Sequence, residues 1–299
     1  MAEKLFGELI AAMVTPFRED GTVDFSLARK LAVKLVEDGC DGIVVSGTTG
    51  ESPTLTREEK LRLIAEVREA LPETTMVWAG SGSYNTRDSV EMTHLAETTG
   101  ADGILAVTPY YNKPSQEGLY RHFKAVAEST SLPIMLYNVP GRTGVNLSPE
   151  TVARLAEIPN IVALKEASGN LDQVSRLLQL KPDFLVYSGD DSLTLPMLSI
   201  GAQGVVSVAC HLVASEMKRM INAYKEGRVG EAREIHLRLW PLFKVLFITS
   251  NPVPVKAALR TIGFPAGPLR PPLCDPSDKE MEEIRRVLGD LGFETRLDP

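Results

Sequence analysis

A short turn sequence recurs three times in this chain and constrains its fold more than any other feature. Gly39-Cys-Asp-Gly-Ile-Val, Gly100-Ala-Asp-Gly-Ile-Leu and Gly201-Ala-Gln-Gly-Val-Val share the pattern Gly-x-(Asp/Gln)-Gly-(Ile/Val). A glycine at this place commonly ends a helix, and the apolar residues after it are typical of a buried strand. Three copies of one helix-to-strand turn are hard to obtain from an irregular fold. They indicate a succession of similar strand–helix units.

Strand candidates and helix candidates alternate over the first three quarters of the chain. We expect strands at residues 8–17, 41–46, 76–79, 103–107, 133–137, 161–165, 184–187 and 204–208. We expect helices at residues 25–38, 56–71, 87–98, 116–129, 149–158, 171–180, 193–199 and 214–225. Eight strands, each followed by a helix, predict an α/β fold of the (β/α)8 TIM barrel type, for which about 200 to 250 residues are normal.

A doubly wound sheet is the alternative fold, and the sequence favours it less. Its usual mark is a glycine-rich dinucleotide fingerprint after the first strand. The nearest match, Gly80-Ser-Gly-Ser-Tyr-Asn85, lacks the third glycine, and no P-loop pattern occurs. For one helix the sequence also predicts the buried face. A capping-box pattern, Thr56 with Glu59, precedes it, and we expect its core-facing residues to be Leu61, Ile64, Ala65 and Leu71.

The alternation stops near Gly230. Helices are expected at residues 231–248, 255–262 and 278–291, with proline-rich stretches between them. We therefore divide the chain into a barrel, residues 1–229, and a C-terminal helical extension, residues 230–299. The extension has several apolar faces and is expected to pack on the barrel or on a neighbouring subunit.

Composition excludes several classes of function. The chain has 43% hydrophobic and 24% charged residues, which is normal for a soluble globular protein. A net charge of −7, without any Lys/Arg-rich run, argues against nucleic-acid binding. Three widely spaced cysteines and four scattered histidines predict neither disulfides nor a metal site and suit a reducing cytoplasm. No apolar run approaches the roughly 18 residues of a membrane helix.

In a barrel of this type, functional residues lie at the C-terminal ends of the strands. Polar and aromatic residues gather at those ends of the expected strands, whereas the strand starts carry the glycine turns. The polar strand ends are Thr48-Thr49, Ser81, Thr108-Pro-Tyr-Tyr111, Tyr137-Asn138, Lys165-Glu166, Ser188-Gly-Asp-Asp191 and Ser207. The sequence thus indicates which mouth of the barrel is functional.

Lys165 ends an otherwise apolar strand that begins after Asn160. A lysine there can extend its amine to water past apolar neighbours. Alternatively, it is a desolvated amine that loses its proton and attacks a carbonyl. Tyr137 ends the preceding strand, and neighbouring strands lie about 4.8 Å apart. Its hydroxyl could therefore move protons for a Schiff base on Lys165, although a core tyrosine is an equal alternative.

Three further strand-end residues have both a structural and a functional interpretation. Thr48 and Thr49, before a glycine, could cap their own turn or hold a carboxylate with their hydroxyls and amides. Arg142 could be a solvated loop charge or a bidentate partner for a substrate carboxylate. Thr48 and Tyr111 could also supply hydroxyls for a proton relay.

Taken together, these motifs resemble those of the 4-hydroxy-tetrahydrodipicolinate synthase family, formerly called dihydrodipicolinate synthase. The resemblance spans nearly the whole chain, and the motifs occur in the family's order. They are Gly47-Thr-Thr-Gly-Glu-Ser52, Thr108-Pro-Tyr-Tyr-Asn112, Tyr137-Asn-Val-Pro-Gly-Arg-Thr143, Lys165-Glu166, Ser188-Gly-Asp-Asp191 and Asn251-Pro-Val-Pro-Val-Lys256.

The resemblance implies a reaction: condensation of pyruvate with L-aspartate 4-semialdehyde in lysine and diaminopimelate biosynthesis. Lys165 would form the imine with pyruvate, and Tyr137 would donate and accept protons. Thr48 and Tyr111 would complete a relay, with Tyr111 reaching into a neighbouring subunit's site. The resemblance implies no metal and no organic cofactor, and a homotetramer built as a dimer of dimers.

It also implies substrate-binding residues. Thr49 and the backbone of Val206 would hold pyruvate, with Gly189 beside them, and Arg142 would bind the carboxylate of the semialdehyde. Two other functions stay open. One is a pyruvate-dependent aldolase for a 2-keto-3-deoxy sugar acid or N-acetylneuraminate, and the other is a non-catalytic barrel that binds an oxo acid.

Lysine-regulated relatives bind lysine at a dimer interface, and this chain departs from their pattern. Ser52 and Tyr110 match, but Arg57, Tyr84 and Asp88 stand where a histidine, an asparagine and a glutamate are common. Tyr84 is bulky and Asp88 is one methylene shorter than glutamate. We therefore expect weak or absent inhibition by lysine.

Overall fold

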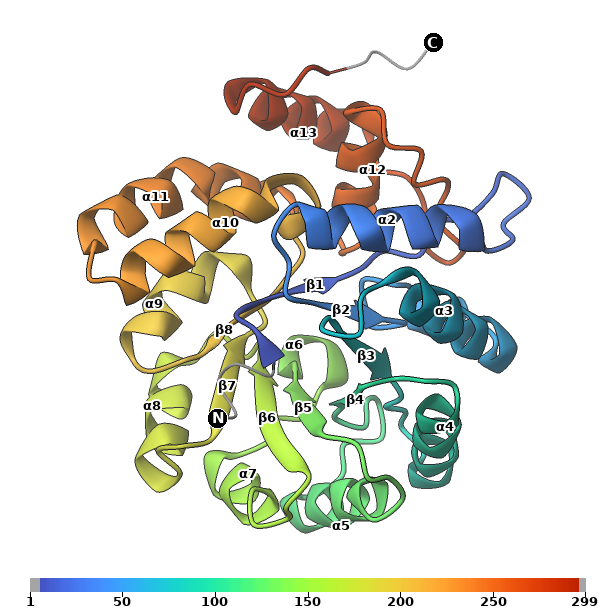
Figure 1. Ribbon diagram of the computed structural model, residues 1–299, viewed down its shortest axis with the longest axis vertical. Coiled ribbons are helices and arrows are strands. Elements are labelled where there is room, and N and C mark those ends of the chain that lie inside the picture. Colours follow the sequence, from blue (N-terminus) through green and yellow to red (C-terminus); the bar gives the residue numbers. More distant parts are fainter. Residues whose placement is uncertain (1–5, 296–299) are drawn as a thin grey trace.

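The computed structural model describes residues 6–295, and within them eight parallel strands close into a barrel in the order β1 to β8 (Figure 1). The strands are β1 Leu9–Ala12, β2 Gly42–Val45, β3 Met76–Gly80, β4 Gly103–Val107, β5 Ile134–Asn138, β6 Ile161–Glu166, β7 Leu185–Ser188 and β8 Gly204–Ser207. Nearly all strand residues are buried, as expected of a sheet covered on both faces. The TIM-barrel prediction is confirmed.

Helices surround the barrel, and the strand-to-helix alternation agrees with the expected one (Figure 1). The barrel helices are α2 Phe25–Glu37, α3 Arg57–Ala70, α4 Thr86–Thr98, α5 Gln116–Ala127, α6 Pro140–Thr143, α7 Pro149–Leu155, α8 Leu171–Leu180, α9 Thr194–Ser199 and α10 Cys210–Lys225. The one-turn helix α6 was not predicted, because Pro140 and Gly141 mark a loop rather than a helix.

The repeated turn joins neighbouring units of the barrel. Its first glycine ends the helix in a left-handed conformation, for example at Gly100, where φ is +99°. Its aspartate then accepts hydrogen bonds from the start of an adjacent strand. A carboxylate oxygen of Asp41 binds the N–H of Leu9 at 2.9 Å, and one of Asp102 binds the N–H of Val77 at 2.9 Å. The second glycine permits close packing, because a Cβ at Gly103 would lie 2.6 Å from the Trp78 ring.

Two local expectations were wrong. The first strand ends at Ala12 rather than at residue 17, and beyond it Phe17 makes only an isolated antiparallel bridge with Val23. Pro16 has no N–H to donate to a strand ladder, so the chain leaves the sheet before it. In α3 the capping box is present, but Ala65 is exposed. Of the other expected core residues, Ile64 and Leu71 are buried and Leu61 packs against the core, whereas Leu63 and Val67 are buried in place of Ala65.

The C-terminal extension consists of α11 Val229–Val245, α12 Val253–Thr261 and α13 Asp278–Asp290. Helix α11 packs on α10, and α12 and α13 pack on each other beside them (Figure 1). The division between residues 229 and 230 stays a prediction. Within residues 6–295, no helix is long and apolar enough to cross a membrane.

Candidate active site

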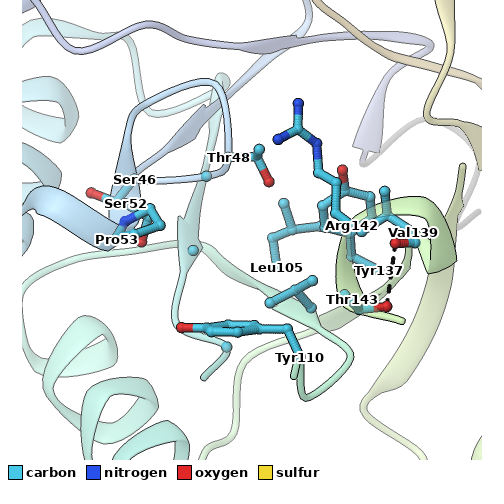
Figure 2. A pocket seen from close by; sticks show the side chains of 14 residues that line it. Ser46, Thr48, Ser52, Pro53, Leu105, Tyr110, Tyr137, Val139, Arg142 and Thr143 are labelled. Atoms are coloured by element: carbon cyan, nitrogen blue, oxygen red, sulfur yellow. Dashed lines mark hydrogen bonds between the residues drawn. The ribbon is translucent and has the colours of Figure 1, made fainter. Parts of the chain in front are cut away.

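A cavity of about 200 Å³ opens at the C-terminal ends of the strands, where the sequence predicted the functional mouth. In Figure 2, Thr48 and Arg142 lie at the top of this cavity, Ser52 and Pro53 at the left, and Tyr110 at the bottom. Tyr137 also lines it, together with glycines and apolar side chains from β3 and β4. Concave, largely apolar sites with a few convergent polar groups are typical of small-molecule binding.

Lys165 and Tyr137 are direct partners in the pairing of β5 with β6, as the sequence predicted. The Lys165 amine lies over the tyrosine ring, 4.3 Å from its centroid. Only 5% of Lys165 and 6% of Tyr137 is exposed, so the amine does not extend to bulk water. Gly189 leaves room for it, because a Cβ there would lie 3.2 Å from the Lys165 Cε. Tyr137 lines the cavity and Lys165 lies directly against it, and a buried amine beside a phenol can react with a carbonyl compound.

The loop that carries Thr48 and Thr49 follows β2 and is fixed from outside the barrel. Thr49 is buried, and its hydroxyl accepts a hydrogen bond from the side-chain amide of Asn251 at 2.9 Å. The hydroxyl of Thr15 donates to the carbonyl of Gly50 at 2.7 Å. The loop is therefore held at both of these residues, while Thr48 is left facing the cavity.

Arg142 projects from α6 over the cavity, and its guanidinium donates to the backbone carbonyl of Asn251 at 3.1 Å. The neighbouring Thr143 hydroxyl donates to the carbonyl of Val139 at 3.2 Å and stabilises this turn (Figure 2). Asn251 thus contacts both Thr49 and Arg142, although we did not predict it as a site residue. The only sequence signal for it was its place in the motif that begins at Asn251.

A buried ion pair lies beneath the Thr48–Thr49 loop. The Lys256 ammonium is 2.9 Å from a carboxylate oxygen of Glu51, and both side chains are fully buried. The ammonium also donates to the carbonyls of Thr15 and Pro268, at 3.1 and 2.6 Å. Burial lowers the pKa of Lys256, and the attraction of Glu51 opposes that shift. This pair ties α12 to the rim of the cavity, and the sequence reasoning missed it.

Tyr111 does not join the cavity of its own chain. Its side chain is 91% exposed and lines an open hollow beside Arg142. Its φ of +75° is rare for a residue with a side chain, and its N–H is bound to the carbonyl of Thr143 at 3.1 Å. Tyr110, by contrast, lines the cavity, and burial raises the pKa of its hydroxyl.

The remaining predicted residues are distributed around this site. The ring of Tyr84 makes an edge contact with that of Tyr110, with centroids 5.3 Å apart. Arg57 forms a bidentate ion pair with Glu91, at 2.7 and 3.1 Å. Asp88 lies in the first turn of α4, and Ser52 lines the cavity at the start of a one-turn 3₁₀ helix, Ser52–Thr54.

Val206 lies within β8, where it pairs with Ile10 and is buried. Among the residues that the structure describes, no cluster of three or more His, Cys, Asp and Glu side chains could hold a metal ion. The polar side chains that line the cavity carry hydroxyls and a guanidinium, and the Lys165 amine lies over the ring of Tyr137, which is one of them. Such a set can bind a carboxylate and carry out imine chemistry.

Comparison with known proteins agrees with this fold. A model of the dihydrodipicolinate synthetase family matches residues 5–291. A 4-hydroxy-tetrahydrodipicolinate synthase of Heliobacterium modesticaldum is 56% identical over 290 residues, which cover 97% of each chain. A crystal structure of the enzyme from Cyanidioschyzon merolae with lysine bound is 49% identical, with a TM-score of 0.95, and covers 97% of this chain and 99% of that one. A crystal structure of the chloride-inhibited enzyme from Acinetobacter baumannii, complexed with pyruvate, is 41% identical, with a TM-score of 0.93. It covers 96% of this chain and 99% of that one.

These matches extend over nearly the whole length of both partners in each comparison, so they concern the barrel and the C-terminal helices together. The chain belongs to the dihydrodipicolinate synthetase family.

Proposed function

We propose that this protein condenses pyruvate with L-aspartate 4-semialdehyde to give 4-hydroxy-tetrahydrodipicolinate, as a lyase of lysine and diaminopimelate biosynthesis. The observation that carries this proposal is the pairing of Lys165 with Tyr137, which lines the cavity, with the amine 4.3 Å from the ring centroid. The relatives named above are 4-hydroxy-tetrahydrodipicolinate synthases, and one of them holds pyruvate.

Lys165 attacks C2 of pyruvate, and loss of water gives an iminium ion. Removal of a proton from C3 gives an enamine, whose carbon adds to the aldehyde of the second substrate. The amino group of that substrate then displaces the lysine as the ring closes, which regenerates the free amine. In this proposal Tyr137 exchanges protons at the nitrogen and at the departing water, with the Thr48 hydroxyl as the next member of the relay.

The carboxylates of the two substrates have separate partners in this proposal. Thr49, the backbone of Val206 and the space at Gly189 receive the carboxylate of pyruvate. Arg142 receives the carboxylate of the semialdehyde, because a guanidinium binds a carboxylate through two parallel hydrogen bonds. Its contact with the Asn251 carbonyl occupies part of its donor capacity and leaves the rest for substrate.

We also propose a homotetramer, built as a dimer of dimers, in the cytoplasm. An exposed tyrosine held at φ +75° suits a side chain that enters a neighbouring subunit's site, which supports a dimer through Tyr111. A second surface carries the exposed apolar residues Leu237, Trp240, Phe247 and Ile248, on α11 and directly after it. Light scattering on the purified protein tests this: a single species of monomer mass would refute the tetramer.

A coupled assay with pyruvate and a panel of aldehydes tests the reaction, and borohydride reduction tests the imine. With pyruvate alone, borohydride should fix one pyruvate-derived adduct on Lys165, and Lys165→Ala should abolish both the adduct and turnover. Arg142→Ala should lower kcat/KM for the semialdehyde by about 100-fold, as loss of a charge-assisted bidentate contact implies.

Three results would contradict the proposal. Lack of any adduct with pyruvate would favour a barrel that binds an oxo acid without turnover. Faster turnover of sugar aldehydes or N-acetylmannosamine than of the semialdehyde would favour a sugar-acid aldolase. Unchanged kinetics of Arg142→Ala would remove its carboxylate-binding role.

A further inference from the structure

A buried carboxylate lies directly after Lys165, on the opposite face of β6. The side chains of Lys165 and Glu166 point to opposite sides of the strand, because side chains alternate along it. Glu166 is 3% exposed. It accepts hydrogen bonds from the Asn138 amide at 3.1 and 3.0 Å, from the N–H of Ser168 at 2.6 Å and from the Gln173 amide at 2.9 Å. All three donor groups are neutral, and together they use both carboxylate oxygens.

Asn138 joins this carboxylate to the loop that carries Arg142. Its amide nitrogen also donates to the side chain of Asn146 at 2.8 Å, and its oxygen accepts from the N–H of Leu147 at 3.0 Å. Residues 138 and 147 bracket the loop that contains α6, so Asn138 closes the base of that loop. We call Asn138, Asn146, Glu166 and Gln173 the strand-end clamp.

The strand-end clamp acts on the strand pair that carries the reacting groups. Asn138 and Glu166 are the pair directly after Tyr137 and Lys165 in the β5–β6 ladder. The same ladder shifts register near its start, between Ile134 and Met135. A slip of one residue turns every side chain of a strand to the other face. Because the start of this ladder is irregular, side-chain contacts at its end have more influence on which residues lie opposite each other.

We propose that Glu166 is a positioning residue for the reaction, which holds the Lys165 amine and the Tyr137 ring at matched heights. This inference rests on the proposed role of Lys165. The carboxylate itself is not in the cavity, and its effect passes through the backbone of β6 and through Asn138. Proton transfers tolerate little displacement, and an error of about 1 Å can slow a reaction by about 100-fold.

The chemistry of the donors explains why a side chain with two acceptor oxygens is needed there. Three donor groups converge on Glu166, and a carboxylate can accept from all of them. A glutamine in its place would turn an amide N–H₂ toward at least one of those donors. That side chain or its partner must then move, and Asn138 or β6 must move with it.

Glu166→Gln is therefore the main test, with Asn160→Asp as the matched control. Asn160 lies at the other end of β6, where its amide donates to the carbonyls of Ala127 and Thr130, each at 3.0 Å. Each variant exchanges an amide with a carboxylate and keeps the shape of the side chain. Each also turns a donor toward a donor, or an acceptor toward an acceptor, in a buried or half-buried position. Only Glu166→Gln should disturb the strand end that carries Lys165.

Four quantities are measured on the folded, full-length variants: kcat, KM for pyruvate, the rate of borohydride-trapped adduct formation on Lys165 and the melting temperature. For Glu166→Gln we expect kcat and the adduct rate to fall by about 10- to 100-fold, while KM for pyruvate stays within about threefold. For Asn160→Asp we expect a lower melting temperature with wild-type kcat per folded enzyme. If Glu166→Gln does not fold, Gln173→Met removes one donor at the half-buried edge of the clamp and should lower kcat about threefold.

The outcomes separate this inference from the proposed function. Wild-type protein that forms no adduct with pyruvate would refute the proposed function itself. Wild-type protein that reacts normally, together with variants of Glu166 and Gln173 that lose only thermal stability, would refute the positioning role alone. An equal loss of kcat in Asn160→Asp would also refute it, because the effect would then follow from general destabilisation.

Discussion

Asp191→Asn should reduce the dependence of thermal stability on pH, because Asp191 is a carboxylic acid in a fully buried position. It lies after β7, and one of its carboxylate oxygens accepts from the N–H groups of Val208 and Ala209, at 3.1 and 2.9 Å. Burial raises the pKa of Asp191 to about 6, although the Ser207 side chain and those N–H groups favour the charged form.

The direction in which stability changes with pH follows from the direction of that pKa shift. A carboxyl whose pKa is higher in the folded protein binds protons more tightly there, so its contribution to stability is complete below about pH 3.8 and is lost as pH rises through about 6. From pH 4 to pH 7 the wild-type protein should lose about 2 kcal/mol through this group alone. The asparagine of the variant cannot ionise, and its one side-chain oxygen can accept from both N–H groups. The variant should therefore lose none of this stability as the pH rises.

Thermal unfolding of both proteins between pH 4 and pH 8 measures this difference. One kcal/mol corresponds to about 2–4 °C for domains of this size class. The melting temperature of the variant should therefore rise relative to wild type by about 4–8 °C between pH 4 and pH 7. Asp183→Asn, which removes one exposed carboxylate, gives the correction for net charge. A difference between the Asp191→Asn variant and wild type that stays constant over this range would refute the assignment of a raised pKa.

Three further predictions concern the rim of the cavity. Lys256→Met leaves the Glu51 carboxylate buried without its cation, so it should lower the free energy of unfolding by about 3–5 kcal/mol in thermal or urea unfolding. A decrease below about 1 kcal/mol would contradict a buried pair. Asn251→Ala removes the donor to Thr49 but keeps the backbone carbonyl that binds Arg142. In steady-state assays it should raise KM for pyruvate by about 5- to 30-fold and leave KM for the semialdehyde within about twofold. Equal changes in the two KM values would contradict this role of the contact between Asn251 and Thr49. Free lysine should inhibit turnover only weakly, in part because the Arg57 guanidinium is paired with a glutamate. Half-inhibition of turnover at sub-millimolar lysine would refute this prediction.

The sequence predicted the barrel and the positions of its strand ends because both depend on local patterns. Apolar runs and glycine turns recur with the period of the unit, so the order of elements follows without knowledge of distant contacts. The pairing of Tyr137 with Lys165 followed from the same reasoning, because consecutive strands of a barrel are neighbours. Errors occurred where the pattern was ambiguous, as at Ala65, or where a proline ended a strand early, as at Pro16.

The contacts made by the C-terminal extension could not be predicted in this way. Asn251 meets Thr49 and Arg142 across separations of 202 and 109 residues, and Lys256 meets Glu51 across 205. Nothing in the periodicity of a helix states which loop of a distant barrel it will cover. A lysine in a helix is also normally expected at the surface, whereas Lys256 is buried because a carboxylate and two carbonyls surround it.

These contacts make the C-terminal extension part of the site rather than an attachment to it. The two residues of the site that it holds, Thr49 and Arg142, are assigned to different substrates, yet both bind Asn251. The Glu51–Lys256 pair ties the Thr49 loop to α12, which begins shortly after Asn251. Through Asn138, Glu166 does the equivalent for the strand end that carries Lys165 and for the base of the Arg142 loop. Arg142 is thus held from both sides, so a change in either support should alter how the second substrate is bound. A barrel cut at residue 229 would keep its eight strands in sequence but would lose one of those supports and leave Glu51 without its cation.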